Sequence, residues 1–311
     1  MADSPEVAGH RLPIAVTPWY ERAGRTALLY VQLTKPRVIE LLLVTTVPAM
    51  ILAAGALPSV LLIVEVLVGG ALAAGGANTI NCWIERDRDQ VMRRTAQRPL
   101  PSGRISPEGA LVFGLVLEIV AFALLWSTVN LLAAALAVSA TLFYVFVYTI
   151  WLKPRSPQNI VIGGAAGAVP VLVGWAAVTG TLAAPAWVLF AIVFFWTPPH
   201  FWALSLRYYD DYRAAGIPML PVARGVEVAL REIAVYSVVV VATTLVLPLV
   251  ADTGAIYLAA AVVLGLVFVW RAMQLVRHSS PERAIAFFMF SNLYLALLFA
   301  AIAVDTLVRS A

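Results

Sequence analysis

Oxygen-bearing side chains recur every fourth residue in the stretch NCWIERDRDQVMRRTAQRPLPSG, residues 81–103. On a helix, Asn81, Glu85 and Asp89 would each lie about 40° around and about 6 Å along from the one before, so they form one row, which Arg93 continues. Two carboxylates and an amide oxygen suit a hard cation such as magnesium, which often shares its oxygen ligands with phosphate. The spacing predicts a magnesium site with Asn81, Glu85 and Asp89 as ligands.

Arginines surround this row. Guanidinium groups bind phosphate oxygens bidentately, so they are candidates for binding a diphosphate: Arg86, Arg93, Arg94 and Arg98. The alternative is that they form salt bridges and mark the cytoplasmic side of a solvated loop. Two features favour a site. The row begins inside an apolar run, where buried polar groups are costly, and the prolines and glycine of RPLPSG would fold the loop over the helix end.

The elements that carry these residues are membrane spans. Of 311 residues, 62% are hydrophobic and 12% charged, against about 25% charged in soluble domains. A run of about 20 apolar residues crosses a bilayer as a helix. Nine such runs are predicted, at residues 37–54, 58–82, 108–127, 131–150, 159–180, 184–205, 232–250, 254–271 and 284–307.

The distribution of basic residues predicts the orientation. Apart from Arg309, every Lys and Arg lies in residues 1–37, 83–107, 151–158, 206–231 or 271–283. The positive-inside rule therefore places the N-terminus and the basic loops in the cytoplasm and the C-terminus outside, in a multi-pass protein of the cell membrane. Topology and anionic lipid or phosphate explain the net charge of +4, so membrane lipid is an expected partner and nucleic acid is not.

Residues 1–24 are polar and contain several prolines, so they are predicted to be a disordered cytoplasmic tail. Residues 25–311 are predicted to form a single transmembrane domain. Its runs 58–82 and 184–205 both go from outside to inside and both end in an acidic, basic loop, which suggests that the two loops face each other. In the second loop, Asp210 and Asp211 could help one metal ion, orient water, or pair with neighbouring arginines.

The pattern N-x-x-x-[DE]-x-x-x-D at residues 81–89, followed by MRRTAQRPLPSGRISP, resembles the first signature of the UbiA superfamily of intramembrane prenyltransferases. The segments WLKPRSPQNIVIGGAAGAVPVLVGW (151–175) and WTPPHFWALSL with DDYRAAGIPMLPV (196–222) extend the resemblance over nearly the whole chain. The resemblance implies an all-α membrane protein with nine helices around a central cavity. It also implies magnesium dependence and transfer of a prenyl group from its diphosphate to a lipid-soluble acceptor.

Within the superfamily, the segments are most similar to members that modify haem. This implies farnesyl diphosphate as donor and a vinyl group of protohaem IX as acceptor, with water completing haem O. Haem A synthase and terminal-oxidase assembly factors are then candidate partners. The resemblance also makes Lys153 a diphosphate contact, to which Asn159 at the start of the next span could add hydrogen bonds.

The second superfamily signature usually has two aspartates four residues apart, with a glycine four beyond. Registered on Gly216, this chain has Tyr208 and Tyr212 at those positions, so its second motif departs from the pattern. His200, near the end of run 184–205, is a further catalytic candidate because it could approach a haem iron or propionate, or move a proton. A packed, hydrogen-bonded interior histidine is the alternative.

Two other functions stay open. One keeps the fold and changes the acceptor to an aromatic quinone precursor. The other is a transporter or channel, which would use the intramembrane carboxylates as an ion path. Such a path predicts charges through the middle of the membrane, whereas here they gather at one face.

Overall fold

The computed structural model describes residues 19–310, except for the side chains of residues 19–23, 37, 38 and 40–43. The predicted tail, residues 1–24, lies mostly outside this range, and the first helix begins within it at Trp19. The described residues are helices and connections. In chain order the helices are α1 (Trp19–Leu33), α2 (Pro36–Ala54), α3 (Val60–Val91), α4 (Pro107–Thr128), α5 (Leu131–Leu142), η1 (Phe143–Leu152), α6 (Asn159–Thr179), α7 (Ala184–Arg207), α8 (Tyr209–Ala214), α9 (Leu220–Arg224), α10 (Val226–Thr244), α11 (Leu247–Val250), α12 (Ala255–Arg277) and α13 (Pro281–Ser310).

Among the described residues, eight helical segments are long and apolar enough to cross a membrane, and α2 contributes a shorter apolar stretch, Val44–Ala54. The chain is thus an all-α membrane protein. The spanning helices carry hydrophobic side chains on all their faces, as expected where one face meets lipid and the other meets neighbouring helices.

The contacts between the long helices close into a ring. Each packs against the next, from α2 through α7 and then α10, α12 and α13, and α13 returns to contact α2. Contacts of α2 with α6 and of α13 with α7 run across the ring. Small residues allow the closest approaches: a Cβ on Gly76 would lie 2.9 Å from the carbonyl oxygen of Gly114, and one on Gly174 would lie 2.7 Å from that of Thr46. At these positions the absence of a side chain lets neighbouring helices pack closely.

Helix α3 is longer than its apolar run. Its 32 residues measure about 48 Å at 1.5 Å per residue, whereas the hydrocarbon layer is about 30 Å thick. Ser59 caps its start by accepting a hydrogen bond from Leu62 N at 3.2 Å. The helix therefore carries its polar final turns beyond the apolar layer, and this places the row of oxygen ligands at one end of the ring.

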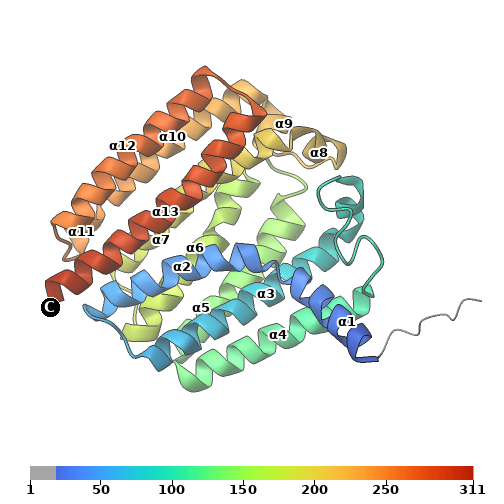
Figure 1. The fold of residues 1–311 in the computed structure, drawn as a ribbon, viewed down its shortest axis with the longest axis horizontal. Helices are drawn as coiled ribbons and strands as arrows, with labels where there is room; N and C mark the ends of the chain where they lie inside the picture. Colours follow the sequence, from blue (N-terminus) through green and yellow to red (C-terminus); the bar gives the residue numbers. More distant parts are fainter. Residues whose placement is uncertain (1–18, 311) are drawn as a thin grey trace, which may run out of the picture.

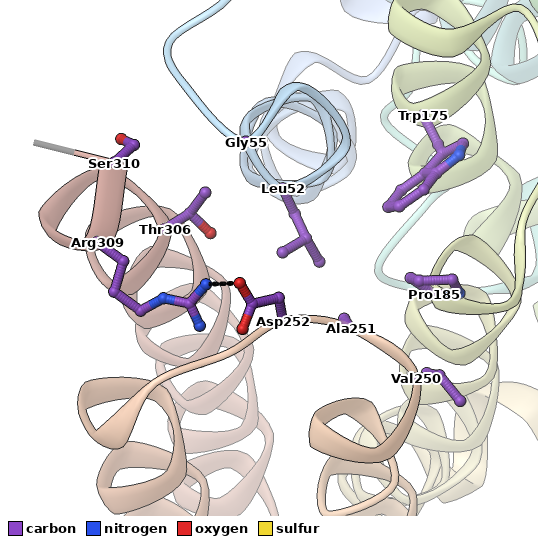
Figure 2. Close-up of a pocket in the computed structure, with 10 residues that line it drawn as sticks. All are labelled: Leu52, Gly55, Trp175, Pro185, Val250, Ala251, Asp252, Thr306, Arg309 and Ser310. Atoms are coloured by element: carbon purple, nitrogen blue, oxygen red, sulfur yellow. Dashed lines mark ion pairs between the residues drawn. The ribbon is translucent and has the colours of Figure 1, made fainter.

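The two ends of the ring differ. We call one the basic end; it holds the 92–106 loop, α8 and α9, which lie together in Figure 1. The other, which we call the Trp175 end, holds the C-terminus and α11. A cavity of about 370 Å³ opens at the Trp175 end (Figure 2), lined by Leu52, Gly55, Trp175, Pro185, Val250, Ala251, Asp252, Thr306, Arg309 and Ser310.

Candidate active site

The predicted row lies on α3, as the spacing required, and it is buried. Asn81, Glu85 and Asp89 are 1%, 3% and 5% exposed. A different cation contacts each of them, and the three cations come from three separate segments of the chain. Lys35 Nζ donates to Asn81 Oδ1 at 2.8 Å.

The other two cations contact the carboxylates. Lys153 Nζ lies 2.6 Å from one oxygen of Glu85 and 2.5 Å from the other, and Arg98 Nη1 donates to Asp89 Oδ2 at 2.7 Å. A hydrogen bond from Asn81 Nδ2 to Glu85 Oε2, 3.0 Å long, links two members of the row. Each buried carboxylate is thus paired with a cation, and an unpaired carboxylate here would be strongly unfavourable.

The charge of each cation depends on its neighbours. Burial lowers the pKa of the Lys153 ammonium, but the Glu85 carboxylate together with Tyr148 and Tyr144 outweighs this, so the net pKa lies above the ordinary value for lysine. Burial also lowers the pKa of Arg98, but Asp89, together with Cys82 and Glu85, raises it above the ordinary value for arginine. For Lys35 burial dominates, and its pKa lies below the ordinary value. Lys153 and Arg98 are thus firmly charged beside the carboxylates.

Helix η1 brings Lys153 and Thr149 to the row. It is a π-helix of 10 residues, a rare conformation that frequently occurs at functional sites. Thr149 Oγ1 accepts from Asn81 Nδ2 at 3.1 Å and donates to Tyr144 O at 2.8 Å. The rings of Tyr144 and Tyr148 stack with their centroids 5.3 Å apart, and Lys153 Nζ lies 5.6 Å from the Tyr148 ring.

The 92–106 loop folds back over the end of α3, as its prolines and glycine predict. Thr95 Oγ1 donates to the carbonyl oxygen of Asp89 at 2.9 Å. Gly103 turns the chain with a φ of 70°, a left-handed conformation that glycine adopts readily. Leu100 is buried in a cluster with Leu33 and Cys82. These contacts hold Arg98 beside Asp89.

Arg93 does not continue the row, and that prediction is wrong. Helix α3 ends at Val91, and Met92 is extended, with φ −85° and ψ 123°, so the helical periodicity stops before Arg93. Its guanidinium lies instead 4.0 Å from Asp211. Arg86 contacts its own helix, donating to Trp83 O at 2.8 Å and lying 5.4 Å from the Trp83 ring. Diphosphate binding by these two arginines stays a prediction.

The second loop does face the first, which confirms that expectation. Arg94 N donates to Asp211 Oδ2 at 3.2 Å, and the Arg94 guanidinium lies 5.1 Å from the Tyr208 ring. Asp210 lines the cavity between the loops. Neither Asp210 nor Asp211 contacts the row of α3 in the hydrogen bonds and ion pairs of the described residues.

His200 is buried between aromatic rings, with centroids 4.2 Å from Trp196 and 4.3 Å from Phe288. Its Nδ1 and Ser291 Oγ are 2.6 Å apart and share a hydrogen bond. Its contacts thus reach from α7 to α13, the geometry expected of the packed interior histidine. A catalytic role for His200 stays a prediction.

The row fits magnesium by its donor chemistry. The row offers two carboxylates and one amide, and waters and a phosphate partner would complete the shell of a magnesium ion. Among the described residues, no group of three acidic, histidine or cysteine side chains could hold a metal on its own. Buried polar atoms nearby are also unsatisfied. Neither side-chain polar atom of the fully buried Asn159 has a hydrogen-bond partner. Such groups are rare unless a ligand or water serves them.

Asn159 lies one helical turn before Gly163 on α6, so the two share a face. A Cβ on Gly163 would lie 2.2 Å from Tyr148, so this face is turned toward η1. Asn159 is thus placed on the side of α6 that packs beside Tyr148 and Lys153.

Sequence reasoning missed Lys35 and Thr149. Lys35 stood among other basic residues of the N-terminal region, and the threonine lay inside an apolar run. One signal existed for Lys35: it precedes Pro36, where the α conformation is disfavoured. It adopts the left-handed region, with a φ of 54°, the only described residue other than glycine to do so. Strained backbone of this kind gathers at functional sites.

Comparison with known proteins assigns the class. Residues 42–294 match the UbiA prenyltransferase family, and the chain belongs to that family. The resemblance seen in the motifs is confirmed.

The closely similar relatives share one activity in their names. The Protoheme IX farnesyltransferase of Mycolicibacterium smegmatis is 52% identical over 292 residues, covering 93% of this chain and 94% of the relative. That of Mycobacterium avium is 53% identical over 92% of this chain and 93% of its own. That of Frankia alni is 55% identical over 90% of this chain and 98% of its own.

Solved structures share the fold. A digeranylgeranylglyceryl phosphate synthase has a TM-score of 0.74 at 19% identity, covering 91% of this chain and 99% of its own. A UbiA homologue from Archaeoglobus fulgidus bound to GPP and Mg²⁺ has a TM-score of 0.61 at 19% identity, covering 88% and 99%. These likenesses establish the UbiA-like arrangement of helices.

Proposed function

We propose that this protein transfers the farnesyl group of farnesyl diphosphate to a vinyl group of protohaem IX, with addition of water, to give haem O and diphosphate. The observation that carries the proposal is the buried row Asn81–Glu85–Asp89, in which each oxygen donor is balanced by a basic side chain from another segment. Relatives that are more than half identical over at least 90% of the chain carry the corresponding name.

Asn81, Glu85 and Asp89 would hold magnesium with the diphosphate. When bound, the ion would neutralise negative charge that develops on the departing diphosphate. Lys35, Lys153 and Arg98 contact the oxygens of the row, so they can exchange these contacts for phosphate oxygens when substrate binds. Asn159 would donate to a remaining phosphate oxygen. Because these groups are already in place, little reorganisation is needed during the reaction.

The covalent chemistry then balances as follows. The bond from farnesyl C1 to oxygen breaks, and its electron pair leaves with the diphosphate. The vinyl carbon forms a bond to C1, water adds its hydroxyl group to the carbon next to the macrocycle, and a proton is released. The stacked Tyr144 and Tyr148 beside Lys153 offer ring faces that favour an allylic cation.

The proposed arrangement in the membrane has nine spans, a cytoplasmic N-terminus and the basic end in the cytoplasm. Cys82 is the only cysteine and is buried, so after its replacement only an introduced cysteine can react with a thiol label. In a Cys82→Ser background, a cysteine at Gln97 should react with an impermeant maleimide only in inverted vesicles. A cysteine at Thr181 should react only in intact cells, and the reverse pattern would overturn the orientation.

The function is tested with purified protein, farnesyl diphosphate, magnesium and haem, followed by mass analysis of the extracted haem. Haem O should accumulate with release of one diphosphate each. Parallel incubation with aromatic acids tests the quinone-precursor alternative, and a prenylated aromatic acid without haem O would replace the proposal. Membership of a prenyltransferase family argues against the transporter alternative. Haem A synthase and terminal-oxidase assembly factors stay candidate partners.

A further inference from the structure

A second basic cluster lies outside the buried row. A cavity of about 410 Å³ at the basic end is lined by Arg93, Arg94, Arg207, Tyr208, Asp210 and Asp211. Its walls come from the loop after α3 and from the junction of α7 with α8. We call Arg93, Arg94 and Arg207 the second arginine cluster.

One tyrosine ring organises this cluster. The guanidinium carbon of Arg94 lies 5.1 Å from the centroid of the Tyr208 ring, and that of Arg207 lies 5.8 Å from it. Guanidinium groups that lie near an aromatic ring keep their N–H edges free for another partner. Tyr208 therefore holds two guanidinium groups at one cavity without neutralising their charge.

The acids of the cavity leave positive charge unbalanced. Asp211 accepts from the backbone of Arg94 and lies 4.0 Å from Arg93, so it is engaged with the loop. Asp210 is exposed and, as the next residue on a helix, points about 100° away from Asp211. The two carboxylates thus form a poor chelate for a metal ion. Within the cavity lining, three guanidinium groups face two acids, and Glu282, outside the lining, interacts with Arg207.

The proposed reaction has two anionic substrates, and the basic end has two basic clusters. The diphosphate is assigned to the buried row, where the amide of Asn81 and the carboxylate of Glu85 lie together. Lys35, Arg98 and Lys153 are the cations that contact that row. In the described part of the chain, the second arginine cluster contacts no member of the row. Planar guanidinium groups can bind carboxylates through two parallel hydrogen bonds.

Resting on the proposed function, we propose that Arg94 and Arg207, with Arg93 at the rim, bind the propionate carboxylates of the porphyrin acceptor. They are specificity-determining residues for the acceptor, and this assignment replaces the diphosphate contact that the sequence predicts for Arg93 and Arg94. Arg93 and the backbone of Arg94 both contact Asp211, so the bound propionates would lie where the loop after α3 meets α8, and the macrocycle could extend from there toward farnesyl C1.

The test compares haem with haem dimethyl ester, whose propionates are uncharged. Variants Arg94→Gln and Arg207→Gln are measured beside Arg277→Gln, an exposed arginine at the end of α12 outside the cavity lining. For wild type, the ester should have a KM about 10- to 100-fold above that of haem, the range for losing hydrogen bonds to a charged group. The two variants should raise the KM for haem similarly, leave that for farnesyl diphosphate within about twofold, and no longer distinguish haem from ester.

Absorbance titration of haem and ester, without magnesium or farnesyl diphosphate, gives the same comparison without turnover. Equal affinity of wild type for haem and ester would overturn the proposal even if the variants fail to fold. A rise in KM for farnesyl diphosphate that matches the rise for haem would also overturn it and assign the cluster to the donor. Failure of wild type to make haem O while it still prefers haem to ester in the titration would instead contradict the proposed reaction and leave the binding site standing.

Discussion

Carboxylates are stabilised in different ways at the two ends of the ring. At the Trp175 end, Asp305 is buried and accepts hydrogen bonds from two backbone groups, Gly254 N at 2.5 Å and Tyr257 N at 3.1 Å. Asp252 pairs with Arg309 beside the cavity (Figure 2) but its side chain is 92% exposed. At the basic end, by contrast, the described contacts of Glu85 and Asp89 are all with side chains.

This contrast distinguishes a carboxylate with a structural role from a carboxylate in a candidate binding site. A carboxylate held by backbone N–H groups at the start of a helix caps that helix and has no freedom to change partner. A buried carboxylate held by lysine or arginine can exchange that cation for a metal ion, and the released cation can follow the incoming phosphate. The basic end therefore has the properties of a site, although both ends have acids, arginines and a cavity.

The largest expected effect is that of Asp89→Asn. The variant keeps the shape of the side chain but loses a charged metal ligand, so kcat should fall at least about 1,000-fold, because metal ligation supplies several kcal/mol of charge stabilisation. Farnesyl-diphosphate-dependent diphosphate release is the measurement. Asp305→Asn is the matched control, and a loss of turnover as large as that of Asp89→Asn would remove the distinction between the two ends.

Glu85→Gln should both inactivate the protein and lower its thermal stability, because Lys153 would remain buried without a counter-charge, at a cost of about 3–5 kcal/mol. Adding Lys153→Met removes that charge. The double variant should regain most of the lost melting temperature in detergent and remain inactive. Recovery of turnover together with stability would mean that Glu85 has only a structural role.

How much of this the sequence could predict depends on the kind of residue. The spans follow from continuous apolar runs, and the row follows from a helical period that α3 maintains to Val91. The sequence does not reveal where that helix ends, because polar helical turns and loop residues have similar hydropathy. The four-residue spacing therefore extends the predicted row to Arg93. The π-helical turn that orients Thr149 depends on packing against α3 and α6, which no local pattern reports.

Asp305→Asn itself should have a moderate effect of another kind. A neutral amide caps a helix less well than a carboxylate beside the helix dipole, so stability should fall by about 1 kcal/mol. The activity of the folded fraction should remain within about twofold. Thermal unfolding followed by assay of the surviving protein measures both, and unchanged stability would show that the backbone contacts of Asp305 contribute little.

Arg309→Gln should have the smallest effect. It breaks an ion pair in which Asp252 is almost fully exposed, and such surface pairs contribute at most about 1 kcal/mol. Turnover and the KM for both substrates should equal those of wild type. A change in the KM for haem would indicate that the cavity at the Trp175 end takes part in acceptor binding.

The most direct test of the central claim is equilibrium binding of Mn²⁺, a paramagnetic substitute for Mg²⁺, followed by electron paramagnetic resonance in the presence of farnesyl diphosphate. Wild type should bind the ion only weakly without farnesyl diphosphate and tightly with it, and Asp89→Asn should lose the tight site while folded. Equal Mn²⁺ binding by wild type and Asp89→Asn would contradict the assignment of the buried row on α3 as the metal and diphosphate site.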